Sequence, residues 1–225
     1  QELNEAFARY ITARRPFVIA KFAASLDGKI ATRTGQSHWI SGEASRRRTH
    51  ELRDTIDAIL VGVDTVLSDD PKLTVKEKYV KNPKHPIRIV LDSDGRTPTD
   101  ALVLNGAAKT IIVTNERCGK TFPNAEVIRC GKKDVDIERL VPELERRGIR
   151  KMLVEGGSKV IWSFLRTRIA DEVCIFIGSM VIGGDASPTP AGGQGAAEEK
   201  DVVQLKLKSA DVLGSGVLVR YEVVK

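Results

Sequence analysis

Residues 57–75 read D-A-I-L-V-G-V-D-T-V-L-S-D-D-P-K-L-T-V, and this stretch decides the fold. Residues 58–63 form a short, almost entirely apolar run rich in β-branched residues, which is typical of a central strand buried on both faces. Thr65 follows with a hydroxyl that can cap or bind, and Asp69 and Asp70 close the segment. Because ligands of open α/β sheets sit beyond the carboxyl ends of strands, this segment is the first candidate for a site. Plain turn chemistry is the alternative interpretation.

The rest of the chain alternates short apolar runs with stretches of helical spacing. The apolar runs predict strands at 16–24, 86–91, 110–114, 125–130, 151–154 and 172–177. The helical spacings predict helices at 3–13, 43–55, 135–148 and 159–168. This alternation favours an α/β fold with a mixed, mostly parallel sheet flanked by helices.

The C-terminal part of the sequence has a different pattern. Residues 188–199 are rich in Gly, Ala and Pro, which predicts a mobile loop. Residues 202–206 and 216–224 alternate apolar and polar side chains, which predicts an antiparallel pair at the sheet edge. Because neither a linker nor a repeat divides the sequence, we expect one domain over 1–225. We expect the helix at 3–13 to pack on the body or on a partner chain.

Composition limits the class of protein. With 225 residues and 41% hydrophobic side chains, the chain can bury a sizeable core. No apolar run approaches the roughly 18 residues that a membrane-spanning helix needs, and the charged residues 1–15 contain no signal-peptide core. We therefore expect a soluble, cytoplasmic protein without a membrane partner. The three cysteines are widely spaced and form no C-x-x-C pair, which indicates free thiols rather than disulfides or zinc.

The net charge of +6 predicts attraction to an anion. Basic and acidic residues are interspersed and only 5% of residues are aromatic, so nucleic-acid binding is disfavoured. A phosphorylated metabolite explains the basic excess equally well. Two places could meet such an anion. Lys29 follows an Asp-Gly turn at a strand end, and Arg46 and Arg53 share one stripe of the helix at 43–55, where two guanidinium groups could grip one phosphate or simply face solvent.

The sequence V-E-G-G-S at 154–158 leads from an apolar strand through a glycine pair into a helix. Such turns hold phosphates, because free backbone amides and the helix dipole point at the anion. Neither a Walker A loop nor a G-x-G-x-x-G fingerprint occurs in the sequence. Glu155, at the strand tip, is either a catalytic group or a partner for backbone amides, and the pattern leaves both open.

Six motifs occur in order: S-L-D-G-K, S-x-W-I-S, V-G-x-x-T-V-L-x-D-D-P-x-L-T-V, R-I-V-L-D-S, V-E-G-G and I-G-G. From Pro16 onward the chain thereby closely resembles the riboflavin-pathway reductases, in their archaeal and fungal stand-alone form. The resemblance implies a dihydrofolate-reductase-like fold, a homodimer and NADPH as cofactor. The implied reaction reduces 2,5-diamino-6-ribosylamino-4(3H)-pyrimidinone 5′-phosphate to its ribitylamino product. The zinc-binding H-x-E and P-C-x-x-C motifs of the deaminase fused to bacterial relatives do not occur in this sequence.

The resemblance also implies roles for individual residues. It places NADPH contacts at Ala23, Trp39, Thr65, Asp69, Asp92, Ser93, Gly156, Gly157 and Ser158. It places substrate contacts at Ser37, Arg53, Leu73, Lys76 and Glu155. Lys29 would lie close to the reacting carbon, so Glu155, Lys29 and Asp69 are the candidate catalytic groups. Bacterial relatives often have arginine where this chain has Lys76, so a phosphate contact there would come from a point charge.

Three alternatives remain open from the sequence. The substrate could be the deaminated 5-amino-6-(5-phosphoribosylamino)uracil. The pair of Asp69 and Asp70 could instead hold Mg²⁺ in a nucleotide or sugar-phosphate transferase, because carboxylate pairs bind hard cations. The third alternative is a nucleotide-binding module that catalyses no reaction.

Overall fold

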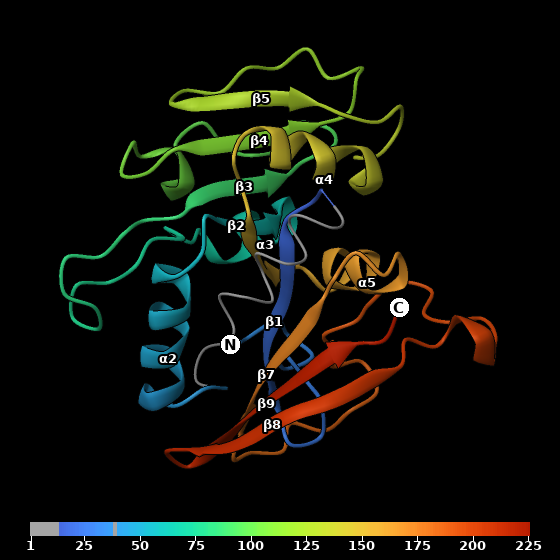
Figure 1. The fold of residues 1–225 in the computed structure, drawn as a ribbon. Helices are drawn as coiled ribbons and strands as arrows, with labels where there is room; N and C mark the ends of the chain where they lie inside the picture. The colour runs from blue at the N-terminus through green and yellow to red at the C-terminus, as the bar shows by residue number, and fades with distance from the viewer. Residues whose placement is uncertain (1–13, 38–39) are drawn as a thin grey trace. The chain divides into compact units, whose positions relative to one another are not determined.

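A computed structural model describes residues 14–37 and 40–225 of the chain. The helix expected at 3–13 and Trp39 therefore lie outside the described residues. The chain forms two compact units (Figure 1). The first comprises Gln1–Val18, as far as it is described, and Glu51–Gly157, and the second comprises Ile19–His50 and Ser158–Lys225. The single domain expected from the sequence stays a prediction.

The first unit carries five parallel strands in the order β5-β4-β3-β2-β6. Their bounds are Ala58–Gly62 for β2, Ile87–Leu91 for β3, Thr110–Thr114 for β4, Ala125–Arg129 for β5 and Lys151–Gly156 for β6. Every residue of β2 is buried, and β2 pairs with β3 on one side and β6 on the other. The prediction of a buried central strand at the start of the deciding stretch is confirmed.

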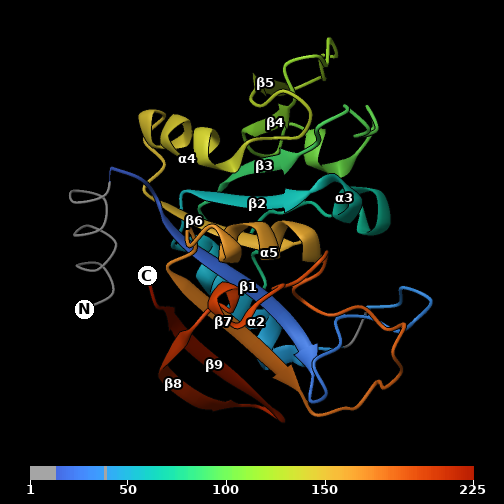
Figure 2. The ribbon, with the colours of Figure 1, turned by 90° about the vertical axis from the view of Figure 1, so that its right-hand side faces the viewer.

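Three short helical elements accompany these strands. Helix α3 (Val63–Asp69) begins directly where β2 ends (Figure 2), the 3-10 helix η1 spans Leu102–Leu104, and α4 spans Ile137–Arg146. The helix predicted at 135–148 is shorter at both ends. Asp136 is its N-cap, and its side chain accepts a hydrogen bond from the Arg139 N–H.

The second unit combines parallel and antiparallel pairing in the order β1-β7-β9-β8. Strand β1 (Phe17–Ser25, which begins in the first unit) runs parallel to β7 (Glu172–Gly178), while β9 (Gly216–Val223) is antiparallel to both β7 and β8 (Leu205–Leu213). Its helical elements are α2 (Glu43–Asp54, whose last turn belongs to the first unit), α5 (Ser158–Arg166) and the 3-10 helix η2 (Glu199–Asp201). The expected antiparallel pair at a sheet edge is confirmed.

The predicted bounds of β8 were wrong. The strand begins at Leu205 rather than at residue 202 and continues to Leu213, where a two-residue turn leads into β9. Nearly all of β8 is exposed, so the alternation of buried and exposed side chains that usually marks a strand is absent from it. Hairpin pairing with β9 sets its bounds instead.

Arg88, on β3, is a fully buried arginine that the sequence pattern did not single out. Its guanidinium donates to the backbone carbonyls of Lys72, Leu102 and Ala108 and to the Asn105 side chain. Burial lowers the pKa of Arg88. The side chain thus ties β3 to the segment after α3 and to η1. Within the described part of the chain, no helix is long and apolar enough to cross a membrane.

Candidate active site

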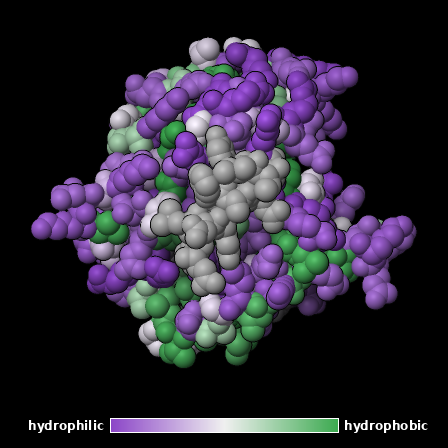
Figure 3. All heavy atoms as spheres, in the orientation of Figure 1, coloured by the Kyte–Doolittle hydropathy of each residue, from purple (hydrophilic) through white to green (hydrophobic). Residues whose placement is uncertain are grey.

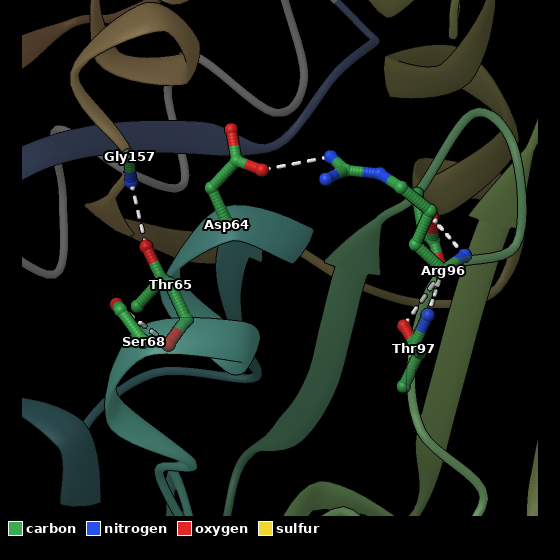
Figure 4. Close-up of polar contacts among 7 residues, drawn as sticks. Asp64, Thr65, Ser68, Arg96, Thr97 and Gly157 are labelled. Carbon is green, nitrogen blue, oxygen red and sulfur yellow. Dashed lines mark hydrogen bonds and ion pairs between the residues drawn. The ribbon is translucent and has the colours of Figure 1, made fainter.

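Candidate residues of the first unit gather where β2, β3 and β6 end. Because these strands are parallel, their carboxyl ends lie at the same edge of the sheet. Helix α3 follows β2, a polar loop at 92–97 follows β3, and the glycine pair follows β6. Figure 4 shows side chains of α3, the 92–97 loop and Gly157 beside one another.

Thr65 binds the glycine pair directly. The Gly157 N–H donates to Thr65 Oγ1 at 3.0 Å (Figure 4), and a Cβ added at Gly156 would lie 3.0 Å from the same oxygen. Gly157 has φ +37°, in the left-handed region that favours glycine. The Gly157 N–H is bonded to Thr65, and the glycine pair lets the backbones of β6 and α3 approach closely. The contact of the glycine amides with an anion stays a prediction.

An exposed ion pair lies beside this contact. Arg96 Nη2 approaches Asp64 Oδ1 to 2.7 Å, with 48% and 67% of the two side chains exposed (Figure 4). The hydrogen bond that Arg96 donates to the Asp64 carboxylate raises the pKa of Arg96. Exposed pairs of this kind contribute about 0–1 kcal/mol to stability, so the pair is not needed to hold the fold. The sequence patterns did not mark Arg96 as a candidate, although an arginine five residues after a strand end is a visible signal.

Asp92 and Ser93 follow β3 and bond within the protein. Asp92 is fully buried, and its carboxylate accepts from the Arg96 N–H, the Thr97 N–H and the Thr97 hydroxyl at 2.7–2.8 Å. Ser93 Oγ accepts from the Val135 N–H at 3.1 Å. Contacts of these two residues with a cofactor stay predictions. The hydrogen bonds give the Asp92 side chain a structural role in shaping the 92–97 loop.

Glu155, at the end of β6, forms an ion pair with Arg53 in the last turn of α2. Arg53 Nε lies 2.8 Å from Glu155 Oε1, and Nη2 lies 2.6 Å from Oε2. Only 15% of the Arg53 side chain and 8% of the Glu155 side chain are exposed. Burial alone would lower the pKa of Arg53, but attraction and hydrogen bonding to Glu155 outweigh it and raise that pKa. The pair is thus doubly hydrogen-bonded and charged.

Arg46 and Arg53, the two arginines that could grip one phosphate, bond to different carboxylates in the structure, and the phosphate clamp stays a prediction. The Arg46 guanidinium bonds to the Glu43 carboxylate and to the Ser41 carbonyl, while Arg53 bonds to Glu155. Residues seven apart lie two helical turns, or about 10.5 Å, from one another along the axis.

The segment after α3 contains two residues with positive φ. Asp70 has φ +38° and the buried Leu73 has φ +52°, an uncommon conformation for a bulky residue. This backbone path directs the Thr74 carbonyl to Arg53 Nη1, at 3.3 Å. The exposed Lys76 follows. Leu73 and Lys76 remain predicted substrate contacts.

The two carboxylates of Asp69 and Asp70 have different partners. Asp69 accepts from the Ser68 hydroxyl at 2.9 Å, whereas Asp70 accepts from the Leu102 N–H at 2.7 Å and so anchors η1. Among the described residues, no group of three or more His, Cys, Asp or Glu side chains could hold a metal ion. Asp70 therefore has a structural role of its own.

In the second unit, Asp27 joins two of the motifs. Its carboxylate accepts from the Ser25 hydroxyl at 2.6 Å and from the backbone N–H groups of Ile182 and Gly183 at 3.0 and 2.7 Å. Ser25 Oγ in turn accepts from the Lys29 N–H at 3.0 Å. The turn that carries Lys29 is thereby fixed to the glycine turn after β7.

We expect the Asp27 contacts to weaken in acid. The hydrogen bond from Ser25, and then those from Ile182 and Gly183, lower the pKa of Asp27 from 3.8 to about 2. Because the folded-state pKa is depressed, the stabilisation is complete above the unfolded pKa and is lost as the pH falls from about 4 through about 2. Melting temperatures of wild type and Asp27→Asn should differ most above pH 4 and converge near pH 2. Asp185→Asn, an exposed change in the glycine turn after β7, should show no such convergence.

The remaining second-unit candidates occupy separate elements. Ala23 lies on β1 opposite Phe176, and Ser158 is the first residue of α5. Ser37 is half-buried in the loop before α2. Their ligand contacts stay predictions.

Comparison with known proteins agrees with the motifs. The model of the RibD C-terminal domain family matches residues 16–219. The 2,5-diamino-6-ribosylamino-4(3H)-pyrimidinone 5′-phosphate reductase of Methanothermobacter thermautotrophicus is 42% identical over 214 residues, covering 93% of this chain and 99% of the relative.

Solved structures agree as well. The Thermotoga maritima diaminohydroxyphosphoribosylaminopyrimidine deaminase/5-amino-6-(5-phosphoribosylamino)uracil reductase superposes with a TM-score of 0.83 and 32% identity, covering 98% of this chain and 60% of that one. Dihydrofolate reductase from Enterococcus faecalis gives a TM-score of 0.51 at 12% identity, covering 93% of this chain and 97% of that one, a likeness of fold alone. The predicted dihydrofolate-reductase-like fold is confirmed. The chain belongs to the RibD C-terminal domain family, the reductases of riboflavin biosynthesis.

Proposed function

We propose that the chain uses NADPH to reduce 2,5-diamino-6-ribosylamino-4(3H)-pyrimidinone 5′-phosphate to its ribitylamino product. The observation that carries the proposal is Glu155, a carboxylate held in an ion pair at the tip of β6, directly before the glycine pair. The name of the Methanothermobacter relative, which the chain covers almost completely, supports this substrate.

The reaction needs a group that stabilises positive charge at the sugar. Opening of the ribosylamine ring breaks the C1′–O4′ bond, moves a proton to O4′ and leaves an imine at C1′. NADPH, when bound, supplies the hydride that C1′ accepts, and a proton adds to the nitrogen. The ionised Glu155 stabilises the cationic form of the imine by charge. Lys29 is the other candidate for a proton transfer, because the resemblance implies that it lies close to the reacting carbon.

Residues at the ends of β2, β3 and β6 fit a nicotinamide nucleotide. The exposed Asp69 and the half-buried Thr65 and Ser93 offer polar groups at this edge. Arg96 adds an exposed guanidinium there. Guanidinium groups accommodate the 2′-phosphate that distinguishes NADPH from NADH. We therefore propose Arg96 as a contact for this phosphate.

Arg96→Ala should weaken NADPH far more than NADH. Loss of a charge-assisted hydrogen bond worth about 1.5–3 kcal/mol predicts a roughly ten- to hundredfold higher Kd for NADPH. Fluorescence titration with both cofactors measures it. Arg146→Ala, which removes an exposed arginine paired with Glu143 in the last turn of α4, is the matched control and should change neither Kd. An equal loss of affinity for NADPH and NADH would show that Arg96 does not bind the 2′-phosphate.

Turnover with both candidate substrates tests the proposed function. NADPH oxidation should depend on the diamino substrate and should persist in EDTA. Faster turnover of the deaminated uracil would reassign the substrate. Activity that EDTA abolishes and Mg²⁺ restores would favour a transferase, and NADPH binding without turnover of either compound would favour a binding module.

We also propose that the chain forms a homodimer. Strand β8 lies at the end of the strand order and pairs with β9 alone among the described strands, and it exposes 56% of Leu207 and 85% of Val212. Green atoms gather along the lower edge of the face in Figure 3, the region where β8 and β9 lie in Figure 1. A second copy would cover this apolar edge. Location in the cytoplasm stays a prediction.

A further inference from the structure

Arg88, on β3, is a fully buried cation to which the described part of the chain supplies no carboxylate. Three of its acceptors are backbone carbonyl oxygens, and the fourth is Oδ1 of Asn105. Among the described residues, its Nε has no hydrogen-bond partner and no acidic side chain forms an ion pair with it. Because a buried charge without an opposite charge is costly, a carboxylate brought to this guanidinium would stabilise the first unit.

Asn105 uses only the oxygen of its side-chain amide in the described hydrogen bonds. Oδ1 accepts from Arg88 Nη1 at 2.9 Å and from the Ala107 N–H at 3.0 Å, whereas Nδ2 donates none of them. Replacement of Nδ2 by an oxygen would therefore break no described bond. It would give Arg88 a carboxylate partner of the same shape as the amide.

The sequence at this position supplies the chemistry for such a replacement. Asn105 is followed by Gly106, and no other asparagine of the sequence precedes a glycine. The backbone nitrogen of a glycine can attack the side-chain carbonyl carbon of a preceding asparagine, because no Cβ hinders its approach. Asn105, Gly106 and Ala107 are all exposed, and a Cβ added at Gly106 would meet nothing within 4 Å. The peptide bond between Asn105 and Gly106 thus has room to rotate toward the side chain.

We propose that Asn105 is a site of spontaneous deamidation and that its aspartate product forms an ion pair with the buried Arg88. The Gly106 nitrogen bonds to Cγ of Asn105 and loses its proton, the Cγ–Nδ2 bond breaks, and Nδ2 leaves as ammonia. Water then opens the cyclic imide. Aspartate forms when the bond between Cγ and the Gly106 nitrogen breaks, and isoaspartate forms when the bond to the backbone carbonyl carbon breaks.

The donors on Oδ1 favour the first step of this reaction. Negative charge develops on Oδ1 when the Gly106 nitrogen adds to Cγ, and two donors lie 2.9 and 3.0 Å from that oxygen. Donors at this distance stabilise an oxyanion, as they do in acyl-transfer enzymes. Neither an oxidant nor a reductant takes part, and water is the only co-reactant. The modification is independent of the proposed function.

Incubation of the folded full chain at mildly alkaline pH, followed by peptide mapping with mass spectrometry, tests the modification. The peptide that contains Asn105 should convert from amide to acid, while those that contain Asn82 and Asn124 should not. Gly106→Ala should slow the conversion, because its Cβ hinders the attacking nitrogen. Absence of conversion at Asn105 in the folded protein overturns the inference, also where the urea-unfolded chain converts, since the fold then keeps Gly106 away from the side chain.

Asn105→Asp tests the ion pair without the reaction. We expect its melting temperature to lie about 3–8 °C above that of the wild type, because a hydrogen bond between two charged groups is stronger than one to a neutral amide. Asn82→Asp is the matched control, since Asn82 is exposed and the same change of charge there should shift the melting temperature by less than about 2 °C. An unchanged or lower melting temperature of Asn105→Asp would overturn the inference.

Discussion

Glu155→Gln is expected to lower kcat for the ribosylaminopyrimidine phosphate by about 100-fold or more, the typical loss when an acid–base or electrostatic group is removed. Glutamine keeps the length of the side chain and one acceptor oxygen, but it removes the negative charge that stabilises a cationic imine. NADPH affinity should hardly change, because the proposed cofactor contacts lie on other residues. Steady-state turnover and a fluorescence titration with NADPH measure the two quantities.

Stability has to be measured beside activity for this variant, because Glu155 is also the partner of a buried arginine. The amide group of glutamine places a donor against a guanidinium that is itself a donor, so we expect a lower melting temperature. Assays well below that temperature separate the two effects. Glu155→Asp, which keeps the charge on a shorter side chain, should retain more activity than Glu155→Gln. Normal turnover by folded Glu155→Gln would make Glu155 a structural partner of Arg53 and nothing more.

The buried strands of the first unit could be predicted from the sequence because their apolar runs leave little choice. Residues of β2 and β4 are all buried, so each strand is a continuous run of apolar or β-branched residues between polar turns. Strand β8 lacked this signal. Its side chains are almost all exposed. Its length is set by pairing with β9, and the local sequence of β8 does not reveal this pairing.

The sequence predicted which residues belong to the candidate site, but not which of their side chains bond to one another. Motifs placed Arg53 and Glu155 among the candidates, yet 102 residues separate them, and no local spacing indicates that they bond to one another. The same holds for Asp27 and Gly183, which lie 156 residues apart. Periodicity reports which face of one element is buried. It does not report which side chains of distant elements meet, so the bond between Arg53 and Glu155 was not predicted, while the contact of Arg53 with a substrate phosphate stays a prediction.

Asp92→Ala should lower the free energy of unfolding by about 3 kcal/mol or more, since hydrogen bonds to a charged group contribute about 1.5–3 kcal/mol each and do not add fully. Three such bonds end on the buried carboxylate: one from the Thr97 backbone N–H, one from the Thr97 hydroxyl and one from the Arg96 backbone N–H. Alanine leaves these donors without their acceptor. Urea unfolding measures the loss. Asp94→Ala is the matched control, because Asp94 is exposed and accepts only a 3.3 Å bond from Asn115 among the bonds described, so it should cost less than about 1 kcal/mol.

The same variant separates the two roles considered for Asp92. If the carboxylate shapes the loop, Asp92→Ala loses stability and, because Arg96 lies on that loop, also loses part of its preference for NADPH over NADH. Arg96→Ala then loses the preference alone, since its exposed ion pair contributes little to stability. If the carboxylate instead contacts the cofactor, Asp92→Ala keeps its unfolding free energy and weakens NADPH and NADH equally. The structure favours the first outcome, because a fully buried carboxylate with three donors can turn toward a ligand only by breaking the loop that holds Arg96.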